Sequence, residues 1–432
     1  MSLIASALNG AIAPEMEQVA AREGVSPELI RQGVAAGTIV IPANINHKNI
    51  VPVGIGRGLR TKVSASIGLA GSSATINEEI VKVKAALAAG ADAIMDLSIS
   101  GEIDAMRRET LAVAPVPVGT LPVYQAMADA AAKYGSSLKM DVEEMFEVIE
   151  RHAADGVDFL ALHCGTTMDI VERAKREGRI DPLVSYGGSH LIGWMVHNKR
   201  ENPLYEQYDR VLSIAKKYNV TLSLADGMRP GCLADSLDGA QVQEMVVLGE
   251  LVRRSRQAGV QIMIKGPGHM PLNHVQATVT LQKSLCQGAP YFVFGPLLTD
   301  IAAGYDHINA AIGGAVSAWA GAEFLCYVTP AEHIGLPDVH QVREGVIAAR
   351  IAAHVGDLAK GMKEAYQWDL EMSVARKRLD WRRQLELAID PERAQEIRKT
   401  RNNSESSACA MCGKYCAMEI VSKYLNSPKH SC

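Results

Sequence analysis

The chain has 432 residues, of which 48% are hydrophobic and 21% are charged, and its formal net charge is −4 at pH 7. This length is enough for one large domain with appendages, and the small negative charge gives no indication of a surface for nucleic acid or membranes. Aromatic residues make up 5% of the chain and no apolar segment reaches the roughly 18 residues that cross a bilayer, which argues against a base-stacking platform and a transmembrane helix.

Residues 1–60 predict a small N-terminal domain that mixes helix and strand. One helix is expected from Pro14 and another from Ser26, with the serine as N-cap and Pro27 at the first helical position. Residues 37–42 then predict a short strand, which a polar loop follows. The first residues lack the basic region of a secretory signal, so we expect a cytoplasmic protein.

Residues 61–338 alternate between short apolar segments and amphipathic helices. Nine segments are candidate strands, namely 62–67, 93–97, 116–120, 159–163, 183–186, 221–225, 261–264, 291–294 and 324–328. Repeated βα units with nearly continuous apolar strands predict a parallel sheet that is buried on both faces. Their number fits a (β/α)8 TIM-type barrel with one additional strand, and a doubly wound sheet is the alternative.

Six of these candidate strands end in small, polar or potentially catalytic residues. The ends are Ser64-Ala65-Ser66, Met95-Asp96-Leu97-Ser98, His163-Cys164-Gly165, Ser185-Tyr186-Gly187-Gly188, Asp226-Gly227-Met228-Arg229 and Lys265-Gly266-Pro267-Gly268-His269. Barrel enzymes build their active sites at the C-terminal ends of the strands, and glycines there let the backbone approach a ligand. One glycine-rich turn is weak evidence, but six similar ends predict a binding site.

Residues 339–400 predict a helical C-terminal domain with many charged residues and no strand. The basic stretch 376–383 could suggest a nucleic-acid surface, but acidic residues such as Glu371 and Glu386 surround it. A solvated helix face or a contact between subunits is the better interpretation.

Residues 401–432 predict a flexible polar tail that carries Cys409, Cys412 and Cys416 at a C-x2-C-x3-C spacing. Three thiolates can hold three irons of a [4Fe–4S] cluster and leave the fourth iron open. A zinc site is an alternative, although structural zinc usually takes four ligands, and redox-active thiols are another. The remaining cysteines are scattered and are expected to be free thiols in a reducing cytoplasm.

Five motifs occur in a characteristic order before the cysteine tail. They are Asp226-Gly227-Met228-Arg229-Pro230-Gly231-Cys232, Gly266-Pro267-Gly268-His269, Gly295-Pro296-Leu297, Gly304-Tyr305-Asp306-His307-Ile308 and Tyr327-Val328-Thr329-Pro330-Ala331-Glu332-His333. The order resembles that of the phosphomethylpyrimidine synthase family, radical S-adenosylmethionine enzymes of thiamin biosynthesis, over nearly the whole chain. The resemblance implies a barrel between a small N-terminal domain and a helical C-terminal domain with a mobile cluster tail. It also implies 5-aminoimidazole ribotide as substrate, a homodimer, and an electron donor such as a flavodoxin or ferredoxin.

The resemblance also assigns roles to individual residues. It implies that Cys409, Cys412 and Cys416 bind the cluster, although the family has one more residue before the last cysteine. It implies that His269 and His333 bind a divalent metal, usually zinc in the family, whereas the residues alone fit polar loop histidines equally well. The implied substrate-binding residues are Ser66, Met95, Tyr124, His163, Ser185, Tyr186, Gly187, Asp226, Gly227, Met228, Arg229, Lys265 and Phe292.

Several positions of the implied pocket depart from the family pattern. Ser66 replaces an asparagine, Tyr186 replaces an arginine, Lys265 replaces a glutamate, and Tyr291-Phe292 inverts a Phe-Tyr pair. An ammonium cannot accept the proton or the hydrogen bond that a carboxylate accepts, so a changed reaction is expected. The pattern resembles an anaerobic branch of the family that converts the same ribotide into 5-hydroxybenzimidazole, a precursor of the cobamide lower ligand. The thiamin pyrimidine as product and a non-catalytic zinc-binding scaffold are the alternatives.

Overall fold

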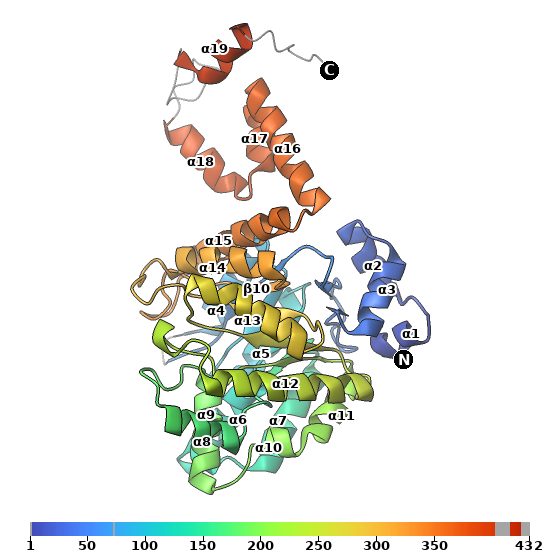
Figure 1. Cartoon of the computed structure of the whole chain (residues 1–432), viewed down its shortest axis with the longest axis vertical. Coiled ribbons are helices and arrows are strands. Elements are labelled where there is room, and N and C mark those ends of the chain that lie inside the picture. The colour runs from blue at the N-terminus through green and yellow to red at the C-terminus, as the bar shows by residue number, and fades with distance from the viewer. Residues whose placement is uncertain (1, 72–73, 402–414, 425–432) are drawn as a thin grey trace. The chain divides into compact units, whose positions relative to one another are not determined.

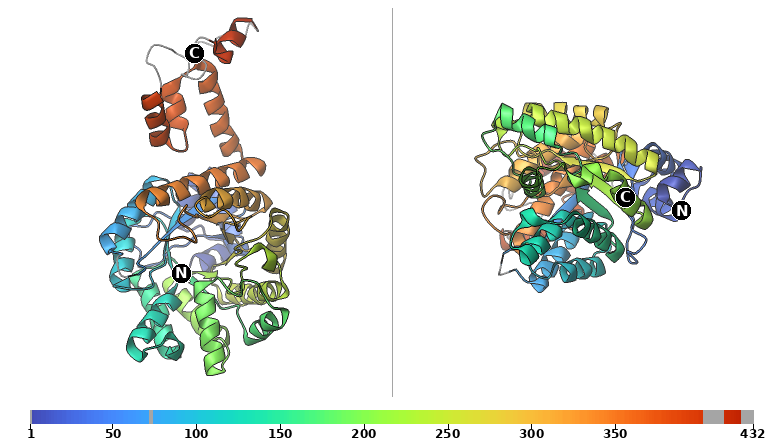
Figure 2. Two further views of the ribbon diagram at one scale, coloured as in Figure 1. Left: turned by 90° about the vertical axis from the view of Figure 1, so that its left-hand side faces the viewer. Right: turned by 90° about the horizontal axis from the view of Figure 1, so that it is seen from below.

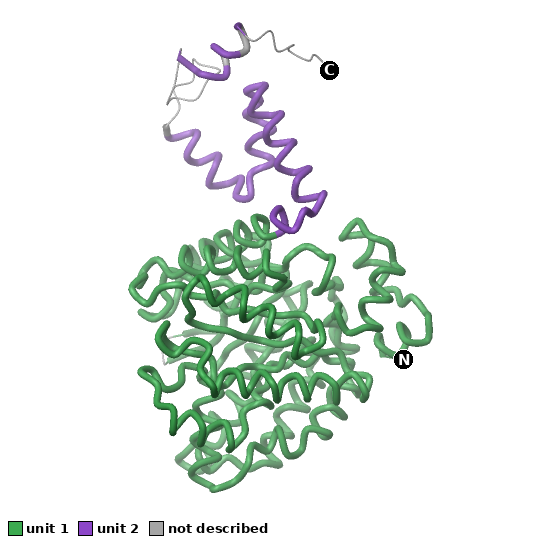
Figure 3. Tube along the Cα trace, in the orientation of Figure 1, with its two compact units in different colours: residues 1–356 green, residues 357–432 purple. Residues whose placement is uncertain are grey.

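The computed structural model describes residues 2–71, 74–401 and 415–424. The chain divides into two compact units, residues 1–356 and residues 357–432 (Figure 3). Each unit has its own arrangement of helices, and the first unit also contains all the strands of the described chain (Figure 1). None of the helices in the described ranges is both long and apolar enough to cross a membrane.

Eight parallel strands of the first unit close into a barrel in the order β10-β3-β4-β5-β6-β7-β8-β9. They are β3 (Lys62–Ile67), β4 (Ala93–Asp96), β5 (Val118–Thr120), β6 (Phe159–Leu162), β7 (Thr221–Leu224), β8 (Ile262–Gly266), β9 (Tyr291–Phe294) and β10 (Phe324–Cys326). Nearly every strand residue is buried, because one face lines the barrel interior and the other packs against helices. The closed barrel confirms the predicted fold and excludes the doubly wound sheet.

Helices surround the strands and cover the outside of the barrel (Figures 1 and 2). They are α4 (Ile76–Ala88), α5 (Ile103–Val113), α6 (Pro122–Tyr134), α7 (Val142–Asp155), α8 (Met168–Glu177), α9 (Tyr186–Asn198), α10 (Pro203–Glu206), α11 (Tyr208–Tyr218), α12 (Gly239–Ala258), α13 (Leu272–Leu285), α14 (Asp306–Ala320) and α15 (Val339–Ala359). Their apolar faces and the outer strand residues form the largest hydrophobic core. This layer fixes the strand ends from which the candidate site is built.

One of the nine candidate strands is wrong. Residues 183–186 do not pair with the sheet but lead into α9, which begins at Tyr186. The Ser185 side chain accepts a hydrogen bond from Gly188 N at 3.3 Å and so caps this helix. Val184 is 37% exposed, whereas strand residues of the barrel are buried. The short apolar run resembled a strand, but the serine and glycines that follow it favour a helix N-terminus.

The N-terminal part comprises α1 (Leu3–Leu8), α2 (Pro14–Glu23), α3 (Pro27–Ala36) and the antiparallel pair β1 (Ile39–Val40) and β2 (Ile55–Gly56). Its helices enclose a small core of their own. Val40, Val53 and Ile55 instead join the apolar residues of the barrel interior, including Phe159 and Phe324 at the starts of β6 and β10. These side chains therefore close the amino-terminal mouth of the barrel.

One buried carboxylate fixes the loop between β1 and β2 to the barrel. Asp158, directly before β6, accepts hydrogen bonds from Asn44 N at 2.9 Å and Val118 N at 2.8 Å, and it contacts His47 Nδ1 at 2.7 Å. His47 Nε2 lies 3.2 Å from Ala114 O, so both ring nitrogens face acceptors. Burial opposes the charged ring, but Asp158 together with backbone carbonyls such as Ala114 O offsets this cost, and the pKa of His47 is raised.

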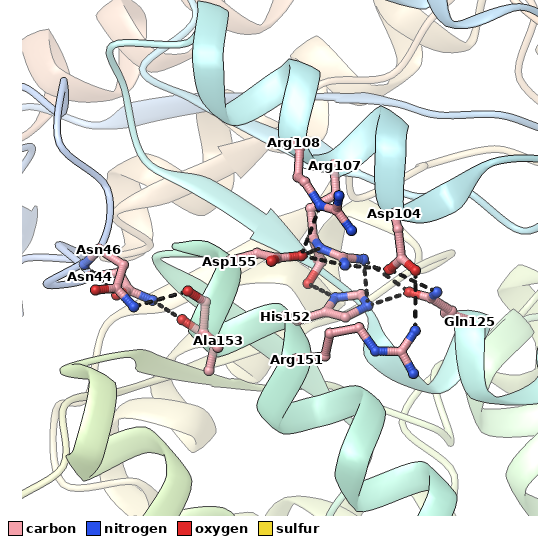
Figure 4. Close-up of polar contacts among 12 residues, drawn as sticks. Asn44, Asn46, Asp104, Arg107, Arg108, Gln125, Arg151, His152, Ala153 and Asp155 are labelled. Atoms are coloured by element: carbon pink, nitrogen blue, oxygen red, sulfur yellow. Dashed lines mark hydrogen bonds and ion pairs between the residues drawn. The ribbon is translucent and has the colours of Figure 1, made fainter.

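A second buried network joins α5, α6 and α7 (Figure 4). Arg107 is fully buried, and its guanidinium donates to Asp155 at 2.6 Å and to Gln125 Oε1 at 2.9 Å. His152 Nε2 lies 2.7 Å from Gln125 Oε1, and its Nδ1 lies 2.8 Å from Thr120 Oγ1. Burial and the charge of Arg107 hold the pKa of His152 well below its usual range, so the ring is neutral. The network fixes α6, whose first turn enters the candidate site.

The second unit contains α16 (Lys363–Arg378), α17 (Trp381–Leu387), α18 (Pro391–Arg401) and α19 (Ala417–Tyr424). Trp368 Nε1 donates to Leu387 O at 2.9 Å and joins α16 to the end of α17. Within the basic stretch 376–383, Arg383 pairs with Glu371 of α16 at 2.6 Å. This pairing supports a helix face whose charges are neutralised by its own neighbours.

We predict that Asp158→Asn lowers the free energy of unfolding by about 3–5 kcal/mol, because removing a buried charge partner leaves His47 uncompensated. An asparagine also turns an NH2 group toward N–H donors that the carboxylate accepted. Denaturant unfolding would measure the change. The control is Asp209→Asn, because Asp209 pairs with Arg254 while its side chain is 86% exposed, and such surface pairs contribute only about 0–1 kcal/mol. Equal effects of both substitutions would contradict the prediction.

Candidate active site

The predicted site residues lie at the carboxyl ends of parallel strands and therefore share one mouth of the barrel. Ser66 and Met95 are paired neighbours on β3 and β4, and Lys265 and Phe292 are paired neighbours on β8 and β9. The segment between β6 and α9 adds His163, Ser185 and Gly187, where His163 contacts Ser185 and Gly187 packs on the His163 ring. The segment after β7 adds Asp226 and its neighbour Arg229, whose charge, like that of Lys265, acts on His163.

Lys265 places a buried ammonium group inside this mouth. Its Nζ lies 3.4 Å from Met95 Sδ and 4.0 Å from the centroid of the Phe292 ring. In the described part of the chain, no carboxylate lies within 4.0 Å of this nitrogen. Burial and the nearby Arg229 lower the pKa of Lys265. A cation in such surroundings suits an anionic or polar group of a ligand.

Asp226 provides the complementary acceptor. The residue is 5% exposed, and neither carboxyl oxygen has a hydrogen-bond partner among the described residues. The nearest guanidinium nitrogen of Arg229 lies 3.7 Å from Oδ1, too far for a hydrogen bond. Burial raises the pKa of Asp226 to about 7, against the opposing charge of Arg229. Near neutral pH this carboxyl can therefore either accept or release a proton.

His163 is buried beside these charges. Its Nε2 lies 2.9 Å from Ser185 Oγ, whereas Nδ1 is buried without a partner in the described chain. Burial, together with the charges of Arg229 and Lys265, lowers the pKa of His163 to about 3. At neutral pH the ring is uncharged and has one nitrogen left for a hydrogen bond with a ligand.

The first turn of α9 packs tightly on two of the predicted residues. A Cβ atom on Gly187 would lie 2.5 Å from His163 Cε1 and 2.9 Å from Tyr124 Cε1, so only glycine fits this position. Tyr124 and Tyr186 meet edge to face with ring centroids 4.9 Å apart. Burial raises the pKa of Tyr124 to about 12, while Tyr186 is 41% exposed at the rim.

His269 and His333 lie side by side, with ring centroids 5.1 Å apart. Each ring is oriented by a carboxylate at Nδ1: Asp300 Oδ1 lies 2.8 Å from His269, and Asp306 Oδ2 lies 3.0 Å from His333. Metal-binding histidines commonly hold a carboxylate in this way and ligate through the other nitrogen. The two rings therefore fit a divalent metal, although no set of three or more ligating side chains occurs among the described residues.

A cavity of about 260 Å³ lies beside the carboxyl ends of β3 and β9. Its lining includes Ser66 and Phe294 from the barrel mouth and His333 from the histidine pair. Ser66 is fixed there because its Oγ lies 3.5 Å from Cys326 Sγ and its carbonyl accepts from Tyr327 Oη at 2.5 Å. A group in this cavity can therefore contact Ser66 and His333.

Sequence reasoning missed the partners that orient these groups. Asp300 and Asp306 lie within or beside quoted motifs, but their pairing with the histidines depends on the fold. Glu244 lies in the middle of α12 and bonds the backbone of the segment after β7, and no sequence pattern distinguished it from other helix residues. Cys326 was noted only as one of several scattered thiols.

The cluster motif is only partly described. Cys409 and Cys412 lie outside the described residues. Cys416 is described in the second unit, where it is 6% exposed and directly precedes α19. The assignment of these three cysteines to a cluster therefore stays a prediction from the sequence.

We predict that the buried neutral His163 makes stability depend on pH. Its folded pKa of about 3 lies below the ordinary value of 6.5, so the unfolded chain binds this proton first as the pH falls. Stability should therefore drop below about pH 6.5, by about 1.4 kcal/mol per pH unit for this group. In urea titrations between about pH 5.5 and 4.5, His163→Gln should lose less stability than the parent by that amount. Parallel losses in the two proteins would contradict the prediction.

Known proteins are similar to this chain over nearly its whole length. The model of the family described as the radical SAM ThiC family matches residues 2–423. The 5-hydroxybenzimidazole synthase BzaA of Moorella thermoacetica is 71% identical over 432 residues, which are the full length of both chains. The 5-hydroxybenzimidazole synthase BzaA of Eubacterium limosum is 59% identical over 427 residues, covering 99% of this chain and all of the other. The phosphomethylpyrimidine synthase of Moorella thermoacetica is 57% identical over the full length of both chains. The chain therefore belongs to the radical SAM ThiC family of enzymes.

Proposed function

We propose that the protein is a radical SAM carbon–carbon lyase that converts 5-aminoimidazole ribotide into 5-hydroxybenzimidazole, the precursor of a cobamide lower ligand. The observation that carries this proposal is a set of buried polar groups at one barrel mouth. The Asp226 carboxyl and His163 Nδ1 have no hydrogen-bond partner among the described residues, and the Lys265 ammonium contacts only Met95 Sδ and the Phe292 ring there. Unsatisfied buried groups are costly, so their presence together supports a polar ligand that pairs with them. Asp226 would accept a hydrogen bond from the exocyclic amine, His163 Nδ1 would bond a second polar atom, and Lys265 would donate to an anionic or hydroxyl group.

The choice of product is supported by similarity. Two enzymes of Moorella thermoacetica align with all 432 residues of this chain. The identity is 71% for its 5-hydroxybenzimidazole synthase and 57% for its phosphomethylpyrimidine synthase. The difference of 14 percentage points (71 − 57) favours the first activity, and the pyrimidine product is the alternative. The buried ammonium of Lys265 on the Phe292 ring supports the same choice, because it replaces an expected carboxylate in the pocket.

The cofactors of the proposed reaction have separate sites. Cys409, Cys412 and Cys416 would bind the [4Fe–4S] cluster, which with S-adenosylmethionine supplies the radical that starts the reaction. His269 and His333 would hold a divalent metal, for which zinc is our proposal because imidazole ligands suit it. An electron donor such as a flavodoxin or ferredoxin, a homodimer and a reducing cytoplasm complete the proposal, and free thiols among the described cysteines suit that compartment.

The side chains of the barrel would bind and orient the ribotide and keep water away from it. Met95 and Phe292 are buried and would line the inner side of the bound ligand. Asp226, with a pKa of about 7, can take a proton from a bound amine or return it without a large change in pH. His163 stays neutral and donates or accepts at Nδ1, which fixes the ring of the substrate.

We predict that the reconstituted protein releases 5-hydroxybenzimidazole. The anaerobic protein with a rebuilt cluster would be given 5-aminoimidazole ribotide, S-adenosylmethionine and a reductant, and the products would be identified by mass spectrometry. Detection of hydroxymethylpyrimidine phosphate in place of 5-hydroxybenzimidazole would contradict the proposed product and support the alternative, a thiamin enzyme. Iron and acid-labile sulfide absent after reconstitution, together with no release of methionine, would instead support a zinc-binding scaffold.

We predict that Lys265→Ala weakens binding of the ribotide by about 10- to 100-fold, which corresponds to a charge-assisted hydrogen bond of about 1.5–3 kcal/mol. Calorimetry of the full chain would measure the dissociation constant. Lys133→Ala is the control, because Lys133 is 60% exposed and pairs with Glu144 on the surface. An unchanged dissociation constant for Lys265→Ala would remove Lys265 from the set of ligand contacts.

We predict that the histidine pair binds one divalent metal per chain. His269→Ala should abolish zinc binding, and Asp300→Asn should weaken it by about 10- to 100-fold, because the carboxylate orients the ring. Elemental analysis and zinc titration of the purified protein would test both. His274→Ala is the control, because His274 lies on α13 and its Nδ1 contacts Ser236 Oγ at 3.1 Å rather than a carboxylate. Full zinc content in His269→Ala would exclude this site.

A further inference from the structure

Glu244 connects two strand-end segments of the barrel from behind the site. It lies on α12, is 1% exposed and accepts three hydrogen bonds. Its Oε1 accepts from Thr166 Oγ1 at 2.6 Å and from Gly227 N at 3.0 Å, and its Oε2 accepts from Met228 N at 2.9 Å. Thr166 belongs to the segment after β6, and Gly227 and Met228 belong to the segment after β7. One carboxylate therefore holds both segments.

Each segment is also held at a second point. Asn202 is fully buried, and its Nδ2 donates to His163 O and to Thr166 O, both at 2.8 Å. Arg179 donates to Met228 O at 2.8 Å and makes two hydrogen bonds with Asp238, the N-cap residue of α12. The backbone on both sides of the Glu244 contacts is thus fixed by buried polar groups.

The two segments pack closely against each other and against the first turn of α9. A Cβ atom on Gly227 would lie 2.2 Å from Thr166 Oγ1, and a Cβ atom on Gly188 would lie 2.7 Å from Gly227 Cα. His163 lies three residues before Thr166, and Asp226 directly precedes Gly227. A shift of either segment would therefore change the separation of the two groups that have unpaired polar atoms at the mouth.

We propose that the hydrogen bond between Thr166 and Glu244 sets the spacing between His163 and Asp226, and that Thr166 and Glu244 are positioning residues for the ribotide. This inference rests on the proposed function, because the spacing matters only if both groups bind one ligand. Neither Thr166 nor Glu244 contacts the ligand in this proposal. Their contribution is to hold two ligand-binding groups at the distance that one small molecule requires.

The test compares substitutions at Thr166 with one at its neighbour. Thr166→Val keeps the shape and removes the hydroxyl, Thr166→Ser keeps the hydroxyl, and Glu244→Gln leaves the shape but presents one NH2 group to an N–H donor. The control is Thr167→Val, because the Thr167 side chain is buried in the same segment and makes no cap hydrogen bond with α8. The full chain would be titrated with 5-aminoimidazole ribotide by anaerobic calorimetry, and its thermal unfolding would be recorded.

Thr166→Val and Glu244→Gln should raise the dissociation constant of the ribotide by about 10- to 100-fold, whereas Thr166→Ser and Thr167→Val should stay within about threefold of the parent. If Thr166→Val does not fold, the contrast between Glu244→Gln and Thr166→Ser decides. A lower unfolding temperature with unchanged affinity in Thr166→Val and Glu244→Gln would overturn the positioning role while the proposed function stands. A parent chain that does not bind the ribotide would overturn the proposed function, and this inference with it.

Discussion

The pairing of β10 with β3 is the interaction on which the rest of the structure depends, because it closes the sheet. Leu325 pairs with Val63 and Cys326 with Ser64, so the last strand of the barrel, β10, lies beside its first strand, β3. Closure leaves no free sheet edge and directs the carboxyl ends of all eight strands to the same mouth. Ser66 and His333, which are far apart in the sequence, line one cavity as a result.

Stability and binding make opposite demands on that mouth. Elsewhere in the first unit, Asp158 and Arg107 are buried charges with full sets of partners: Asp158 meets three donors, and Arg107 donates to Asp104, Asp155 and Gln125. At the mouth, Asp226 and Lys265 are buried without such partners, which costs folding free energy. The firmly bonded groups behind them, above all Glu244, keep the costly arrangement in place.

The sequence was sufficient to predict the barrel, because buried parallel strands consist of short apolar runs separated by amphipathic helices. It was misleading at residues 183–186, where two apolar residues precede a helix cap and resemble a strand of the same length. The six strand ends predicted where the site lies, but the roles of single residues such as Tyr124 and Phe292 came from the family resemblance. The contacts of the structure bring most of these residues together. Their protonation and partners could not be predicted, since the pKa of Asp226 depends on burial and the orientation of His269 on Asp300. The part of the candidate site that involves Cys409 and Cys412 lies outside the described residues.

The residues of β1, β2 and the loop between them that fill the amino-terminal end of the barrel limit how small molecules can enter and leave. Val40, Val53 and Ile55 are at most 7% exposed and pack on the aromatic floor of the interior. Within the described chain, a reactant that enters the carboxyl-end mouth has no passage onward through that floor. A substrate and its product would therefore pass through the same end of the barrel. With a single opening, release of the product would have to precede binding of the next substrate molecule, whatever the rate of the chemical step.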